Sequence, residues 1–95
     1  MPKQKVSNTV EATLIERGKV HGPFVTHSHI AQAIKAAMRT SPQWTGLEDD
    51  VKECLESIAA KMARILNGGD AHSDSYHDIA GYAMLIEHRL TGTKL

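Results

Sequence analysis

The sequence predicts an all-α domain of four helices, and three observations support this. Apolar residues recur every three or four positions in four separate segments. Glycine, proline and asparagine separate those segments, and none of them alternates apolar with polar residues as a strand does. A chain of 95 residues forms one domain with a thin core. We therefore expect a flexible basic tail over residues 1–6, and a single domain over 7–95 that enlarges its core by forming a homo-oligomer.

The first two helices are expected over residues 8–18 and from about 26 to 40. Asn8 is a favourable N-cap for the first helix, and Gly18 is a stop signal at its end. Residues 19–24 contain a Gly-Pro pair and are expected to form a loop. Thr26 or Ser28 is expected to cap the second helix, which must end before Pro42 because the residue before proline avoids the α conformation.

The third and fourth helices are expected over residues 45–67 and from about 73 to 90. Thr45 is the candidate N-cap of the third helix, and Ser73 or Asp74 is that of the fourth. We expect these two helices to be the longest and to pack antiparallel. The third has the clearest apolar stripe, which consists of Val51, Leu55, Ile58, Ala59, Met62, Ile65 and Leu66.

Composition narrows the range of partners. There are 11 basic and 11 acidic residues, and aromatic residues make up only 4%, which argues against nucleic acid as a partner. No apolar run approaches the roughly 18 residues of a membrane helix, so we expect no membrane association. The N-terminus lacks the apolar segment of a signal peptide, which indicates the cytoplasm. The single cysteine, Cys54, is expected at a packing edge rather than as a nucleophile.

Two charged clusters are candidates for chemistry. Glu53 and Glu56 are neighbours on the third helix, and two such carboxylates can share Mg²⁺. Lys61 and Arg64 lie one turn apart beside a glycine-rich turn, where they would clamp a phosphate. The alternative is that both clusters are the solvated outer face of a helix, with acids first and bases last to suit its dipole.

Three segments of the chain resemble a family of small phage and prophage proteins. Residues 14–24, LIERGKVHGPF, resemble its ERG-x-x-(Y/H)G-x-F opening. Residues 61–68, KMARILNG, resemble its K-(I/M)-A-R-(I/V)-L-N-G segment. Residues 74–83, DSYHDIAGYA, resemble its D-S-(W/Y)-x-D-I-A-G-Y-A signature. The resemblance extends over about residues 12–90.

This family is similar, more distantly, to the MazG-type nucleoside triphosphate pyrophosphohydrolases, which are all-α. Their ExxE and ExxD motifs carry the acids that hold Mg²⁺ over the phosphates. The resemblance implies a MazG-like four-helix bundle in which Glu53 and Glu56 match ExxE and Asp78 matches the final acid. Ser75 stands where the second glutamate of that pattern would be, a departure that bears on catalysis more than on nucleotide binding.

Three functions follow as expectations. The preferred one is a phage-type nucleotide-binding protein that sequesters a nucleotide-derived signal of host antiviral defence, in the cytoplasm of the host cell. The first alternative is a Mg²⁺-dependent MazG-like pyrophosphohydrolase, with Glu53, Glu56 and Asp78 on the metal. The second alternative is a structural or interaction module without a ligand. The expected ligand contacts are Arg17, Lys19, His21, Phe24, Lys61, Arg64, Asp74, Tyr76, Asp78 and Tyr82.

Overall fold

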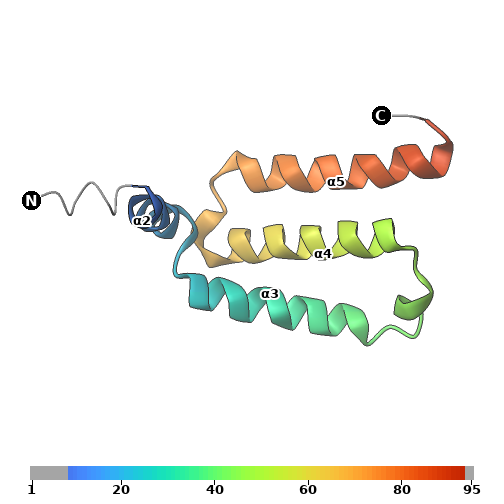
Figure 1. The fold of residues 1–95 in the computed structure, drawn as a ribbon, viewed down its shortest axis with the longest axis horizontal. Coiled ribbons are helices and arrows are strands. Elements are labelled where there is room, and N and C mark those ends of the chain that lie inside the picture. Colours follow the sequence, from blue (N-terminus) through green and yellow to red (C-terminus); the bar gives the residue numbers. More distant parts are fainter. Residues whose placement is uncertain (1–8, 94–95) are drawn as a thin grey trace, which may run out of the picture.

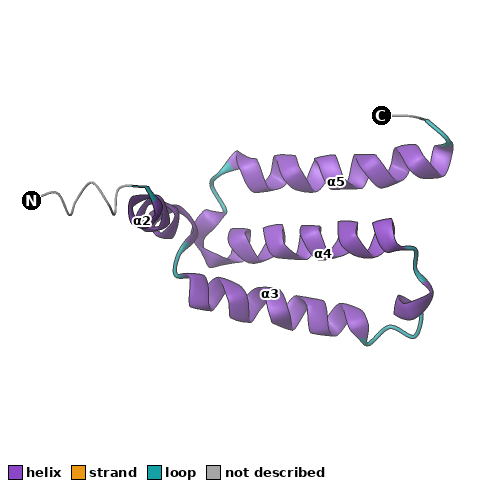
Figure 2. Cartoon of the chain, viewed as in Figure 1, coloured by secondary structure: helices purple, strands orange, loops and turns teal. Residues whose placement is uncertain are grey.

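The computed structural model describes residues 9–93, and every regular element in that range is helical (Figures 1 and 2). The expected all-α architecture of four helices without strands is confirmed for these residues. A single 3-10 turn, Trp44–Gly46, precedes the third of the helices among the described residues. A turn over Ile65–Gly69 follows that helix, and its backbone leaves the helical conformation at Asn67 and Gly68. The four helices are α2 (Val10–His21), α3 (Phe24–Arg39), α4 (Asp49–Arg64) and α5 (Ser73–Thr91).

Three of the helices form one layer. Helices α3, α4 and α5 lie side by side with α4 in the middle, and α2 packs across one end of the layer (Figure 1). Neighbouring helices run antiparallel, as expected for α4 and α5. Within the described part of the chain, α2 crosses one end of this layer rather than lying along it, and the MazG-like bundle stays a prediction. The expectation that the last two helices are the longest is wrong for α4, since α3 and α4 both have 16 residues.

The boundary between α2 and α3 differs from the expectation. α2 continues through Gly18 to His21 and ends at Gly22, so residues 19–21 are helical rather than a loop. α3 begins at Phe24, because Pro23 has a φ of −65° and its carbonyl oxygen accepts the first helical hydrogen bond, from His27 N at 3.1 Å. Neither of the expected caps, Thr26 and Ser28, starts the helix. The Ser28 hydroxyl donates instead to the Phe24 carbonyl oxygen at 2.9 Å.

The later helices also begin at other residues than expected. Thr45 lies in the 3-10 turn, and the extended residue before α4 is Glu48. His72, rather than Ser73 or Asp74, precedes α5. In both cases backbone conformation sets the start, since no side chain caps either helix. The end of α5 agrees with the expectation, because Gly92 adopts a left-handed conformation and reverses the chain.

The core is thin, as the chain length indicated. The large residues of the α4 stripe are less covered than expected, since Leu55, Met62 and Leu66 remain 40%, 41% and 65% exposed. A layer one helix thick explains this, because it buries only the seams between helices. The buried apolar residues of the described chain are all small, namely Ala31, Cys54, Ala59 and Ala63.

Two further expectations concern the membrane and the N-terminus. No helix among residues 9–93 has the length and apolar character to cross a membrane. The tail expected over residues 1–6 and the cap Asn8 lie outside the described residues.

Candidate functional site

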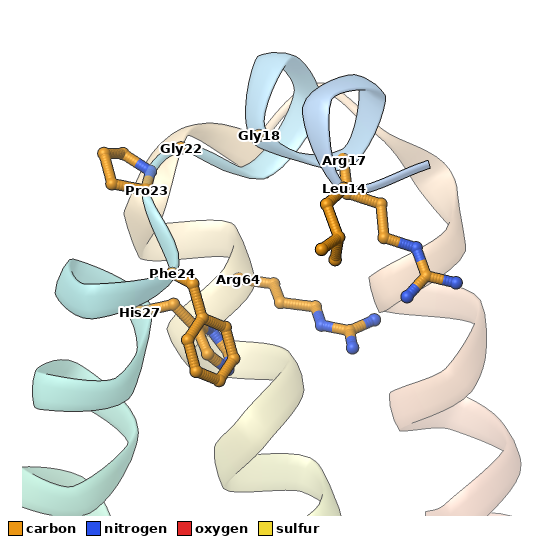
Figure 3. A pocket seen from close by; sticks show the side chains of 8 residues that line it. All are labelled: Leu14, Arg17, Gly18, Gly22, Pro23, Phe24, His27 and Arg64. Atoms are coloured by element: carbon orange, nitrogen blue, oxygen red, sulfur yellow. The ribbon is translucent and has the colours of Figure 1, made fainter. Parts of the chain in front are cut away.

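A cavity lies where α2 crosses the layer. Its volume is about 620 Å³, within the range of small-molecule sites in proteins. Side chains from α2, α3 and α4 surround it (Figure 3). Residues 18–24, around the turn between α2 and α3, supply half of the wall. The lining residues are Leu14, Arg17, Gly18, Gly22, Pro23, Phe24, His27 and Arg64.

The turn at Gly22 and Pro23 holds α2 over this cavity. Gly22 has φ +74° and ψ −176°, a conformation that is open essentially to glycine alone. Its Cα packs directly against the backbone carbonyl of Asn67, so that no side chain fits there. The Asn67 side chain donates from Nδ2 to the Pro23 carbonyl oxygen at 2.9 Å. These contacts hold the α2–α3 turn against the turn that follows α4. They therefore fix the position of α2 relative to α4 on either side of the cavity.

Arg17 and Arg64 give the cavity its charge. Both side chains extend into the same space, Arg17 from α2 and Arg64 from α4 (Figure 3). The other two arginines of the chain, Arg39 and Arg89, are neutralised by carboxylates of α4 and its preceding residue. In the described part of the chain no carboxylate forms an ion pair with Arg17 or Arg64. None of the described residues that line the cavity is acidic, so its wall favours an anion.

An aromatic shelf lies beside these guanidinium groups. The Phe24 ring is 77% exposed, although a phenylalanine would normally be buried. It lies 5.8 Å from the His27 ring, centroid to centroid, with 31° between the ring planes. Leu14 faces the shelf from α2 (Figure 3). The cavity thus combines two cationic donors with an apolar, aromatic surface, an arrangement that suits a ligand with a phosphate and a ring.

Lys61 lies one turn from Arg64, but its ammonium group is already paired. Its Nζ is 2.8 Å from the Asp78 carboxylate of α5, and the lysine side chain is only 16% exposed. The hydrogen bond from Lys61 holds the pKa of Asp78 below its ordinary value, and Arg64 nearby acts in the same direction. Lys61 therefore joins α4 to α5 within the chain, while Arg64 faces the cavity.

The three acids expected to hold Mg²⁺ point to different partners. Glu56 accepts a 2.7 Å hydrogen bond from Arg39 of α3. Glu53 lies within 3.5 Å of the Ser57 hydroxyl, and Asp78 pairs with Lys61. Among residues 9–93, no three His, Cys, Asp or Glu side chains converge on a site for a metal ion. The Mg²⁺ site stays a prediction.

The remaining expected ligand contacts are dispersed. Lys19 pairs with Glu16 along α2 at 3.1 Å, and Asp74 is exposed at the start of α5. Tyr76 donates its hydroxyl to the Asp70 carbonyl oxygen at 2.9 Å. Tyr82 is half-buried against α4, where its carbonyl oxygen accepts from the Cys54 thiol at 3.3 Å. The side chain of His21 lies outside what the structure describes. Of the ten expected contacts, the cavity brings together Arg17, Phe24 and Arg64.

Five cavity residues were not assigned to the site by sequence reasoning: Leu14, Gly18, Gly22, Pro23 and His27. The Gly-Pro pair carried a usable signal, because a turn between two helices places the end of one helix and the start of the next around a common space. Leu14 and His27 carried no such signal. Their roles depend on the angle at which α2 crosses the layer.

A second hollow, of about 490 Å³, lies between α4 and α5 near their other end. Arg89 is the one arginine or lysine among the described wall residues, and it forms ion pairs with Asp50 and with Glu48, the latter at 3.1 Å. Glu53 adds a further negative charge to the wall. These carboxylates offset the arginine, so the hollow is less suited to an anion than the cavity under α2.

In comparisons with known proteins, no protein-family model, curated protein or solved structure matches the chain.

Proposed function

We propose that this chain binds a nucleotide or a nucleotide-derived anion in the cavity under α2. The observation that carries the proposal is the pair formed by Arg17 and Arg64, which share one cavity. Among residues 9–93, neither has a carboxylate partner of the kind that Arg39 and Arg89 have. A guanidinium group matches phosphate with parallel hydrogen bonds, and two of them at one cavity favour a ligand with at least one phosphate.

The Phe24 shelf supports a nucleotide over free phosphate. Stacking of a base on an aromatic ring contributes about 1–3 kcal/mol, and the exposed face of Phe24 is available for it. Arg64 and Phe24 come from different helices and meet at the same cavity. A ligand that spans both would engage its phosphate on one side and its base on the other.

The resemblance to small phage proteins supplies the biological context of the proposal. In that context the protein sequesters a nucleotide signal of host antiviral defence in the host cytoplasm and acts as a homo-oligomer with a MazG-like bundle. Sequestration needs contacts to the phosphate and the base but no complete metal cage. The residue that would complete the metal set, Asp78, is engaged by Lys61. This pairing supports binding without hydrolysis.

A direct test is titration with a nucleotide panel in the presence of Mg²⁺. The panel contains mononucleotides, nucleoside triphosphates and cyclic dinucleotides, with inorganic phosphate as the minimal anion. For whichever compound binds the parent protein, Arg64→Ala should weaken the affinity by roughly tenfold or more, because a charge-assisted hydrogen bond is worth about 1.5–3 kcal/mol. Arg39→Ala is the matched control, since Arg39 lies at the far end of α3 and pairs with Glu56.

Chromatography of the bound and released material separates the candidate functions. Intact nucleotide recovered after denaturation supports sequestration. Release of pyrophosphate instead supports the Mg²⁺-dependent enzyme and contradicts our proposal. Absence of binding across the panel, or equal affinity of the parent and Arg64→Ala, also contradicts it and leaves the interaction module.

A further inference from the structure

The layer of three helices has one polar and one apolar side. The contacts of α4 define these sides: Cys54 and Lys61 reach α5, and Glu56 reaches α3. At about 100° per residue, Glu53 and Arg64 project from one broad side of the layer. Met62 is two residues from Arg64, so it projects about 200° away from it, on the opposite side.

This opposite side, here named the apolar face, lacks charge along its centre. The middle of α4 supplies only apolar residues there, and Leu55, Met62 and Leu66 remain 40–65% exposed. On α5, Asp78 and Arg89 pair with residues of α4 on the polar side of the layer. The next residue in a helix is rotated by about 100°, so Ile79 and Leu90 project toward the apolar face. On α3, Arg39 reaches Glu56, and Ile34 projects from the opposite side of the helix at about 100° per residue. By this projection we assign to the apolar face Val51, Leu55, Ile58, Met62 and Leu66 of α4, Ile30 and Ile34 of α3, and Ile79, Ala83 and Leu90 of α5.

Within residues 9–93, no second layer of helices covers this face. No large side chain of the described residues is fully buried. Stable domains contain at least two layers of secondary structure around a common core, and α3, α4 and α5 provide one. An exposed apolar area this continuous marks an interaction surface.

We propose that a second copy of this chain covers the apolar face, so that two layers of three helices stack face to face. The dimensions agree with this. α4 has 16 residues and is about 24 Å long at about 1.5 Å per residue. Three helices spaced by about 9 Å, each about 10 Å in diameter, span about 28 Å. The face therefore measures about 700 Å², close to the roughly 800 Å² per partner of a stable interface.

Charge also favours a second copy over a different partner. Basic and acidic residues number 11 each, so two copies carry no net repulsion. The centre of the apolar face offers no charged group that would select an oppositely charged protein. A two-fold axis through α4 would pair the face with itself, as is typical of homodimers.

The inference gives the homo-oligomer proposed above a defined surface and does not depend on the ligand. Arg64 and its cavity lie on the polar side of the layer, away from Met62. Both cavities of the dimer would then open to solvent. Loss of nucleotide binding and loss of dimerisation should be separable by mutation.

The test is the solution mass of variants matched in residue type and exposure. The parent protein should have about twice the 10.4 kDa chain mass at micromolar concentration. Met62→Glu should reduce it to one chain mass. Met84→Glu is the control, because Met84 is 50% exposed on the outer side of α5, and this variant should remain dimeric.

A second measurement covers the case in which Met62→Glu does not fold. The melting temperature of the parent protein should rise with protein concentration, because association stabilises only the folded chains. A parent protein with one chain mass and a concentration-independent melting temperature would overturn the proposal and leave the face to another partner. A Met84→Glu variant that dissociates as readily as Met62→Glu would also overturn it.

Discussion

Replacement of Gly22 by alanine should destabilise the fold strongly, because both the backbone conformation and the neighbouring atoms at this position exclude a Cβ. The φ of +74° with ψ near 180° costs a non-glycine residue about 1–3 kcal/mol. The new Cβ would also collide with the backbone carbonyl oxygen of Asn67, which cannot move as a flexible side chain does. Overpacking of this kind costs about 1–3 kcal/mol more. The expected loss of unfolding free energy is therefore about 2–6 kcal/mol.

Urea denaturation monitored by circular dichroism measures this loss, and thermal melting provides a second readout. A loss of 2 kcal/mol in a domain of this size corresponds to a fall of about 8–16 °C in melting temperature. Gly18→Ala is the control, since Gly18 is inside α2 and no atom lies within 4 Å of the added Cβ. Alanine should stabilise that position by about 0.5–1 kcal/mol. A Gly22→Ala variant within 0.5 kcal/mol of the parent would refute the contact between Gly22 and Asn67.

Three further predictions concern α4 and α5. The Asp78 pKa lies below its ordinary value, so the stability it contributes with Lys61 should be complete above about pH 4 and lost as the pH falls through the lowered folded value. The difference in urea midpoint between the parent and Lys61→Met should then shrink in acid, and a constant difference from pH 7 to pH 2 would contradict the pairing. Gly81→Ala should raise the unfolding free energy, measured by urea denaturation, by about 0.5–1 kcal/mol, because Gly81 is inside α5 and no described atom lies within 4 Å of the added Cβ. A loss of stability would show that another part of the protein packs against Gly81. Burial raises the pKa of the Cys54 thiol, so iodoacetamide should label the native protein far more slowly than the urea-unfolded one, and equal labelling rates would show that the thiol is open to solvent.

Helix content was predictable because it depends on local periodicity. The stripe of α4 and the stop at Gly92 are features of a single segment, and both agree with the structure. The starts of the helices were less predictable. α3 begins directly after Pro23, because the ring fixes φ of that residue and its ψ is extended. Thr26 and Ser28, which have good capping propensity, therefore lie inside the helix.

The binding site was predictable in part. Arg17, Phe24 and Arg64 were expected contacts, and all three reach the cavity. Lys61 had the same sequence features as Arg64, yet it pairs with Asp78 because its position on α4 turns it toward α5. Arg64, one turn further along α4, faces the cavity instead, so the two residues differ in role because they face different neighbours.

The sequence by itself determined the number of helices, the apolar stripe of each and the residue types available to an anion. Those properties follow from spacing along one segment and need no knowledge of neighbouring segments. Only the tertiary structure decided that α3, α4 and α5 form a single layer with α2 across its end. That arrangement depends on contacts between residues far apart in sequence, such as Gly22 with Asn67 and Arg39 with Glu56. For the same reason, it alone placed two arginines around one cavity and left the stripe of α4 exposed on the other side.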